Sequence, residues 1–400
     1  MNAMRRAAIL KMNAMRRAVS HLSSSELVAR FQRACGLFPV AREKLNGHAG
    51  NHGEEERIRN GTARGQRKHH DEHESSYSTA KYEVRNWPLY FLFVVSATLG
   101  NEVFYISFLP FIHWNLDPFL CRRLVNIWAV VMYIGQVTKD VLKLPRPTAP
   151  PVVKLEVRVD AEYGLPSTHA MAATAISFTL LLSAPERVQF QFEVGLVLAV
   201  VLSGLVCLSR LYTGMHSALD VICGILISAV ILGISYPHWN TLDSLQLNSP
   251  LSPVVALVLP LYLCYKYPEL DHYSTTREDT TIIMGVAAGC SVGYWANQQL
   301  GLTFEPEGPF PVTLGPLTAR TVTLCAARFC VGLVLLVLTR QTARWASLRL
   351  LCRNYGVALG DVEAHKRKEI EVPYKFSTYS AIGLVNSVVV CRAFMLLGLL

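Results

Sequence analysis

The segment SRLYTGMHSALD, residues 209–220, carries three ionisable side chains between two apolar runs. Arg210 ends the first run, and His216 and Asp220 stand four residues apart at the start of the second. Side chains four residues apart on a helix lie on the same face, so this spacing would place the carboxylate against the imidazole. A carboxylate bonded to one ring nitrogen fixes the tautomer and raises the basicity of the other nitrogen, which makes this histidine a candidate nucleophile. The alternative is a polar pair with a purely structural role at a helix end.

A second polar group lies in the segment KDVLKLPRP. Lys139 and Arg146 are seven residues apart, and Pro145 and Pro147 flank the arginine. The prolines end a helix and favour an extended turn, which would hold the guanidinium in one place. The alternative is a pair of cations that extend from a helix end into the membrane interface.

The third polar group lies in the segment LPSTHAMAATAISF. Ser167 or Thr168 is a candidate N-cap residue, and His169 would lie in the first turn of the following helix. The free backbone N–H groups at a helix N-terminus can bind an anion. Taken alone, this pattern is more typical of an ordinary capped helix.

Long apolar segments must position these three groups. The chain has 400 residues, of which 51% are hydrophobic and 17% are charged, a balance typical of a polytopic membrane protein. Because hydrocarbon offers no partners to backbone groups, apolar runs long enough to cross it must form helices. The sequence therefore predicts an all-α, polytopic membrane helical bundle. We expect about nine spans, near residues 87–109, 121–142, 168–185, 191–209, 216–235, 252–267, 280–298, 319–339 and 376–398.

Counting these spans places all three polar groups on one face of the membrane. The two arginines and the lysine would there bind a phosphate, with a helix N-terminus and a hydroxyl as further donors. Two histidines remain as candidates for nucleophile and general acid, and the one beside an aspartate is the candidate nucleophile. This inventory predicts phosphoryl transfer without a metal ion or other cofactor. Because the groups lie at the membrane edge, they favour a lipid phosphate as the substrate.

The remainder of the chain divides by composition. We expect residues 1–85 to form a polar, basic, largely disordered tail, 86–240 a catalytic membrane core and 241–400 additional C-terminal transmembrane helices. Within the tail, LVARFQRACGLF at residues 27–38 has apolar residues at helical spacing. This spacing predicts a short amphipathic helix, which would lie on the membrane or pack on the body of the protein. The ten cysteines show neither CxxC pairs nor zinc-ligand spacing.

The three polar groups together resemble the signature of the type 2 phosphatidic acid phosphatase superfamily. K-x6-RP, PSxH and SR-x5-H-x3-D all occur, in order and at comparable spacing. The middle motif reads PSTH, where PSGH is commoner. The stretches NEVFYISFLPFIHWNLDP, PRPTAPPVVKLE and IEVPYKFSTY further resemble the sphingosine-1-phosphate phosphatases. This resemblance covers most of the chain after Trp87 and one patch of the tail.

The resemblance implies a phosphatidic acid phosphatase type 2 / haloperoxidase-like core that hydrolyses sphingosine-1-phosphate and related long-chain base phosphates. It implies that His216 attacks phosphorus to form a phosphohistidine, that Asp220 orients His216, and that His169 is the general acid and base. It also implies a multi-pass location in the endoplasmic reticulum membrane, a lipid phosphate as partner, no nucleic acid and no metal. The phosphate-binding residues would be Lys139, Arg146, Ser167, Thr168 and Arg210.

Other functions are consistent with parts of the sequence. Glucose-6-phosphatases share the signature and a nine-span plan, and broad-specificity lipid phosphate phosphatases share the signature with six spans. An anion transporter or channel would need polar residues along several spans, whereas here they gather at one end. A non-catalytic regulator of sphingolipid enzymes would not need the complete motif set.

Several polar features lie outside the motifs. Glu162, shortly before PSTH, could pair with a substrate ammonium, although a solvated loop carboxylate is the commoner role. Asn101 and Glu102 fall inside the first predicted span, where helix–helix hydrogen bonding is expected. Lysine and arginine are more frequent on the predicted site face, which favours a cytosolic site, whereas the superfamily resemblance implies a lumenal or exterior one. Glycosylation of the Asn60 sequon would distinguish these topologies.

Overall fold

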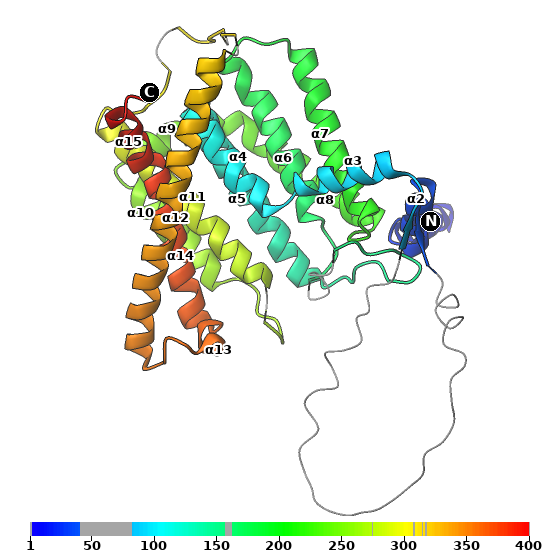
Figure 1. The fold of residues 1–400 in the computed structure, drawn as a ribbon. Helices are drawn as coiled ribbons and strands as arrows, with labels where there is room; N and C mark the ends of the chain where they lie inside the picture. The colour runs from blue at the N-terminus through cyan, green and yellow to red at the C-terminus, as the bar shows by residue number, and fades with distance from the viewer. Residues whose placement is uncertain are drawn as a thin grey trace, which may run out of the picture.

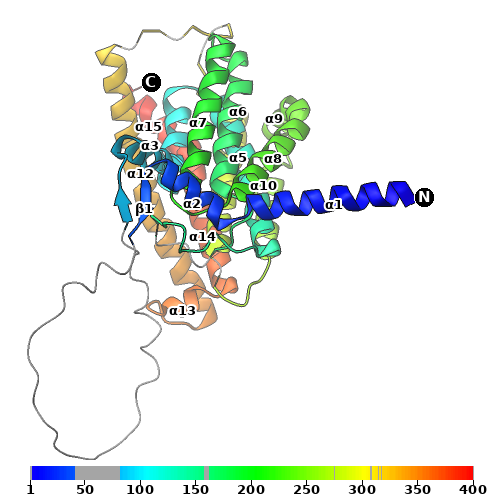
Figure 2. The same cartoon turned by 90° about the vertical axis from the view of Figure 1, so that its right-hand side faces the viewer.

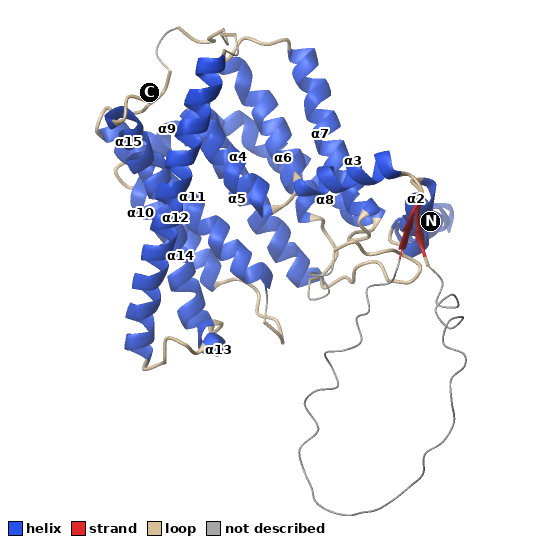
Figure 3. Cartoon of the chain, viewed as in Figure 1, coloured by secondary structure: helices blue, strands red, loops and turns tan. Residues whose placement is uncertain are grey.

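The computed structural model describes residues 2–40, 82–156, 162–273, 275–306, 309–313, 315–316 and 318–399. Most of these residues are helical, and the long helices form a bundle (Figures 1 and 3). The predicted all-α class is confirmed, with one short two-stranded sheet added. The elements are α1 (Asn2–Leu22), α2 (Ser25–Ala34), β1 (Leu37–Pro39), β2 (Tyr82–Val84), α3 (Trp87–Thr98), α4 (Glu102–Asn115), α5 (Pro118–Leu142), α6 (Thr168–Ser183), η2 (Ala184–Glu186), α7 (Phe192–Tyr212), α8 (Ala218–Ser235), η3 (Tyr236–His238), α9 (Trp239–Asn248), α10 (Ser252–Tyr265), α11 (Thr275–Gln299), α12 (Ala319–Tyr355), α13 (Val362–His365), α14 (Lys368–Leu384), η4 (Val385–Val389) and α15 (Val390–Leu396).

Several helical segments are apolar and long enough to cross a membrane, so the protein is a multi-pass membrane protein. Within the described residues, four segments meet both conditions: Phe192–Tyr212, Ala218–Asn248, Ala319–Tyr355 and Lys368–Leu396. Two shorter apolar helices are α3 and α10. The expected number of about nine spans stays a prediction.

The first predicted span, 87–109, is not one helix. Helix α3 ends at Thr98, and α4 begins at Glu102 with Asn101 as its N-cap residue. Helix α3 crosses α7, whereas α4 runs alongside α5 (Figure 1). Gly100 lies at the break, where an added Cβ would come within 3.1 Å of Cδ2 of His169. The prediction of a continuous span was wrong. Hydrophobicity shows that a segment is apolar but does not show where one helix ends and the next begins.

Helix α5 joins the two halves of the bundle. It packs on α4 and α6 on one side and on α11 on the other. The central apolar cluster includes Tyr105 from α4, Leu124 and Trp128 from α5, Met284 from α11 and Phe376 from α14. The C-terminal helices therefore pack directly on the helix that carries Lys139.

At the end of the bundle away from the three motifs, buried arginines are paired with carboxylates. Arg187 contacts Asp117 at 2.5 Å and Glu305 at 2.8 Å. Arg123 contacts Asp243 and Glu186, each at 2.8 Å. Buried charges are stable only when paired, and these pairs join the start of α5 to α9 and to the loops.

The N-terminal segment packs on the body through α2, which lies where the sequence predicts a short amphipathic helix. Ser24 caps α2, and Val28, Ala29 and Gln32 are buried. Strand β1 follows and pairs antiparallel with β2. Helix α1 extends away from the body (Figure 2). Residues 41–81 of the predicted tail, including Asn60, lie outside the described residues.

Candidate active site

Lys139 lies near the C-terminus of α5 and is 1% exposed. Its Nζ donates to Oε2 of Glu162 at 3.2 Å and to Oγ1 of Thr168 at 3.3 Å. The second contact joins the first motif to the N-terminus of α6. A buried ammonium with oxygen partners on two sides is suited to bind an anion that replaces one of them.

Arg146 lies in the non-helical segment that its flanking prolines predict. Its Nε donates to the carbonyl oxygen of Glu162 at 2.9 Å, and its Nη2 donates to the Glu162 carboxylate at 3.1 Å. Its Nη1 donates to the carbonyl oxygen of Met215 at 3.1 Å. The guanidinium therefore joins the first motif to the residue directly before His216.

The PSTH motif forms the start of α6. Ser167 is the N-cap residue, and its hydroxyl accepts from the backbone N–H of Ala170 at 3.4 Å. Its own N–H donates to the carbonyl oxygen of Asp220 at 3.0 Å, which joins the second motif to the third. A Cβ at Gly224 would come within 2.8 Å of the Ser167 carbonyl oxygen, so this glycine allows α8 to approach the cap closely. His169 follows in the first turn and lines a cavity.

Arg210 lies in the last turn of α7 and is 1% exposed. Its Nη2 lies 3.3 Å from Oε1 of Glu156 and 3.4 Å from the carbonyl oxygen of Ala97. The arginine thus reaches α3 as well as the segment that follows Arg146. Like Lys139, it is a buried cation held by a carboxylate.

His216 lies in the loop between α7 and α8. The sequence placed it on the helix with Asp220, but α8 begins at Ala218 because Ser217 is its N-cap residue. The Asp220 carboxylate accepts from the Ser217 N–H at 2.7 Å and closes a capping box. Its Oδ2 lies 3.7 Å from Nδ1 of His216, which is beyond hydrogen-bond length.

The direct partner of His216 Nδ1 is the carbonyl oxygen of Gly164, at 3.0 Å. A carbonyl oxygen can only accept, so the proton of the neutral imidazole lies on Nδ1. The lone pair then lies on Nε2. This is the tautomer that an Nε2 nucleophile requires.

Burial and the neighbouring charges favour the neutral form of His216. Burial, followed by the positive charges of Arg146, Lys139 and Arg210, lowers the pKa of His216 well below its ordinary value. Glu162 acts in the opposite direction but does not reverse the shift. For Glu162 itself, burial raises the pKa, but the charges of Lys139 and Arg146 outweigh burial and lower it. Both shifts favour a charged Glu162 carboxylate beside a neutral imidazole.

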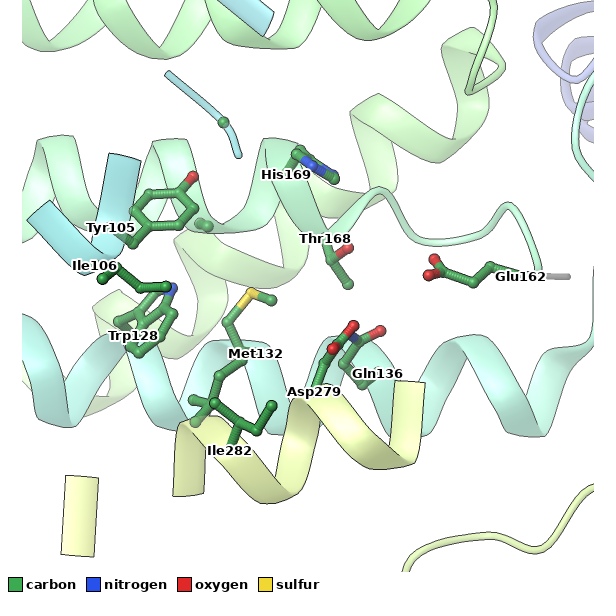
Figure 4. A pocket seen from close by; sticks show the side chains of 13 residues that line it. Tyr105, Ile106, Trp128, Met132, Gln136, Glu162, Thr168, His169, Asp279 and Ile282 are labelled. Atoms are coloured by element: carbon green, nitrogen blue, oxygen red, sulfur yellow. The ribbon is translucent and has the colours of Figure 1, made fainter. Parts of the chain in front are cut away.

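A cavity of about 130 Å³ opens beside this cluster (Figure 4). Glu162, Thr168 and His169 line it on the side of the motifs. Gln136 of α5 and Asp279 of α11 line it from the other side. The motif residues thus border a cavity that α11, from the C-terminal half of the chain, helps to line.

The structure joins several of the predicted site residues through shared contacts, which do not include the side chains of His169 and Arg210 among the described contacts. Lys139 and Arg146 both donate to the Glu162 carboxylate. The Ser167 N–H donates to the carbonyl oxygen of Asp220, and Arg146 donates to the carbonyl oxygen of the residue before His216. The sequence did not reveal the Gly164 carbonyl, because a backbone acceptor has no residue signature. The sequence also did not predict that Glu162 pairs with Lys139 and Arg146. The two roles expected for Glu162 were a solvated loop carboxylate and a partner of a substrate ammonium, and neither includes these contacts.

Comparisons with known proteins agree with the motif pattern. The model of the family described as the PAP2 superfamily matches residues 121–243, which contain all three motifs. Sphingosine-1-phosphate phosphatase 2 from Homo sapiens is 48% identical over 94% of this chain and 98% of its own length. The Mus musculus protein of the same name is 49% identical over 95% and 98%. Sphingosine-1-phosphate phosphatase 1 from Rattus norvegicus is 40% identical over 79% and 74%. No solved structure matches the chain significantly.

Proposed function

The chain belongs to the sphingosine-1-phosphate phosphatase family within the PAP2 superfamily, and we propose on this basis that it hydrolyses sphingosine-1-phosphate and related long-chain base phosphates. The products are the free long-chain base and inorganic phosphate. The enzyme acts in sphingolipid metabolism and signalling, in the endoplasmic reticulum membrane. The observation that carries this proposal is the similarity to sphingosine-1-phosphate phosphatases over nearly the whole chain.

In the proposed reaction, His216 is the nucleophile. Its Nε2 lone pair attacks phosphorus, the bond between phosphorus and the ester oxygen breaks, and the departing oxygen takes a proton from His169. Water then attacks the phosphohistidine, His169 accepts the water's proton, and the P–N bond breaks. The tautomer set by Gly164 supports this role because it leaves Nε2 free.

The cations of the motifs bind the phosphoryl group. Lys139, Arg146 and Arg210 neutralise its oxygens, and the backbone N–H groups at the start of α6 near Ser167 and Thr168 add donors. Asp220 stabilises the charge that develops on the imidazole during attack. Because this scheme places a covalent step on histidine, it requires no divalent metal ion.

The proposal is tested with membranes that carry the full chain. Phosphate release from sphingosine-1-phosphate is measured in EDTA for the parent protein, for His216→Ala and for the matched control His238→Ala. His238 is exposed near the far end of α8. We expect release from the parent and the control, and no release from His216→Ala at equal expression.

Two results would overturn the proposal. Full activity in His216→Ala, or an absolute need for magnesium, contradicts the phosphohistidine scheme. A rate on glucose-6-phosphate that rivals the lipid rate contradicts the substrate assignment and favours a sugar phosphatase.

A further inference from the structure

Two cavities lie beside the proposed active site, and they differ in polarity. The smaller one, of about 130 Å³, borders Thr168 and His169 (Figure 4). Two buried side chains that line it, Trp128 and Gln136, each keep a polar atom without a hydrogen-bond partner among the described residues. Such atoms are costly unless a ligand or water supplies the partner, so this cavity suits the polar part of a ligand.

The larger cavity, of about 470 Å³, lies between α4, α6 and α7 and is apolar along its length. Among the described residues that line it, Tyr105 and Ser177 alone carry a polar side chain. Along α7 the lining runs from Val206, toward the motifs, to Gly195, which at 1.5 Å per residue is about 16 Å. This length and polarity suit a hydrocarbon chain.

The two cavities are adjacent at Tyr105 and Gly100. Tyr105 lines both, and its buried hydroxyl has no partner among the described residues. A Cβ added at Gly100 would lie 3.1 Å from Cδ2 of His169 and 3.2 Å from Cγ1 of Val206. The proposed general acid and the lining of the apolar cavity therefore approach the same glycine. A lipid whose phosphate is bound by the motif cations can extend past Tyr105 into the apolar cavity.

The end of the apolar cavity away from the motifs is formed by the loop before α7. Phe190 lines it there, and Cε2 of its ring would lie 2.5 Å from a Cβ added at Gly195. Backbone hydrogen bonds hold this loop: the Gln189 N–H donates to the carbonyl oxygen of Val312, and the Val312 N–H donates to that of Arg187, each at 2.9 Å. The Phe190 ring therefore closes the cavity from a fixed backbone.

The cavity can be reached from the membrane on the side of α7. Leu198 and Leu202 line it and are 55% and 46% exposed, so they also face the surroundings of the helix. In a bilayer these surroundings are lipid chains. A hydrocarbon chain can thus enter the cavity sideways without being transferred through water, a transfer that the hydrophobic effect opposes.

Building on the proposed function, we propose that the apolar cavity binds the hydrocarbon chain of the long-chain base phosphate and that Phe190 sets the longest chain it accepts. The substrate chain is the occupant because the cavity adjoins His169, where the phosphate end of the same molecule reacts. A longer chain must displace the Phe190 ring, and a shorter chain leaves apolar surface uncovered. One methylene more or less in a hydrophobic pocket changes kcat/KM about tenfold or more.

The test measures kcat/KM in mixed micelles for long-chain base phosphates that differ only in chain length, from shorter to longer than sphingosine-1-phosphate. We expect one best length in the parent. Phe190→Ala should move the best length to longer chains, and Ala199→Leu, which fills the cavity along α7, should move it to shorter chains. Each should change the ratio of kcat/KM between a long and a short chain about tenfold. Phe192→Ala and Ala229→Leu, at exposed residues outside the described lining, are the matched controls and should keep the parent profile.

Opposite shifts in the two variants cannot result from misfolding, which lowers activity on all chain lengths alike. If Ala199→Leu does not fold, the direction of the shift in Phe190→Ala decides. Equal activity on all lengths in the parent, or the parent profile in Phe190→Ala, overturns the chain site while the phosphatase function stands. A uniform loss in Phe190→Ala assigns the cavity to a structural bilayer lipid and also overturns it. A parent that hydrolyses no member of the series refutes the proposed function itself.

Discussion

The carboxylate of Glu162 accepts a hydrogen bond from Nη2 of Arg146 at 3.1 Å. The same oxygen lies 3.2 Å from Nζ of Lys139, so one carboxylate occupies two of the cations proposed to bind phosphate. Oxygen atoms of a phosphate would require the same donors. An incoming substrate must therefore displace this carboxylate or share its partners.

Removing the charge of Glu162 should strengthen phosphate binding. In Glu162→Gln, the inhibition constant of inorganic phosphate should fall by roughly three- to tenfold, because the competing anion is gone. Glu269→Gln, at an exposed glutamate paired with Lys368, is the matched control and should leave the constant unchanged. Weaker phosphate inhibition in Glu162→Gln would show that the carboxylate organises the cations instead of competing for them.

The activity should persist in mildly acidic solution. The pKa of His216 is lowered, first by burial and then by neighbouring cations, so the imidazole stays neutral and nucleophilic below its ordinary pKa of about 6.5. The acid limb of kcat/KM should therefore lie below that pH, with activity lost as pH falls through the lowered pKa. The limb is measured with two phosphate esters whose own ionisation differs. A limb above pH 6.5 with both substrates contradicts the assignment.

Substitution of Asp220 should be less damaging than substitution of His216. The Gly164 carbonyl holds Nδ1–H directly, whereas the Asp220 carboxylate lies 3.7 Å away. Asp220→Asn should therefore keep the tautomer and lose only charge stabilisation, with kcat reduced roughly 10- to 100-fold. This is less than the ~10⁴-fold loss seen when a carboxylate alone fixes the histidine tautomer. A loss equal to that of His216→Ala would mean that Asp220 is the true orienting group.

The N-terminal segment should stabilise the site through Gln32. Its amide exchanges hydrogen bonds with Val153, at 2.7 and 2.9 Å, and donates to the carbonyl oxygen of Tyr212 at 2.8 Å. Gln32→Ala would leave buried backbone groups unpaired, so the free energy of unfolding should fall by about 1–3 kcal/mol. Thermal unfolding in detergent measures this, with Gln191→Ala as the matched control, because Gln191 is exposed and its side chain makes no capping hydrogen bond. An unchanged melting temperature in Gln32→Ala would show that α2 does not support these segments.

The sequence predicted which motif segments lie together better than it predicted the paths of the helices. The motifs could be found because each combines a helix end with ionisable residues at short spacing, as in Arg210, His216 and Asp220. The contacts of Glu162 could not be predicted because Lys139 and Arg146 are distant from it in sequence. The break before α4 could not be predicted because it lies within an apolar run that shows no interruption. The N-cap at Ser217 was likewise missed, although Ser-x-x-Asp is a recognisable capping pattern.

The central claim is that Nε2 of His216 becomes covalently bonded to phosphorus. The most direct measurement is to quench the enzyme during turnover of radiolabelled sphingosine-1-phosphate and to identify the phosphorylated atom. We predict an acid-labile phosphohistidine on the peptide that contains His216, substituted at Nε2 because Nδ1 is bonded to Gly164. A label on His169, a label on Nδ1, or turnover without any covalent phosphate would contradict the account.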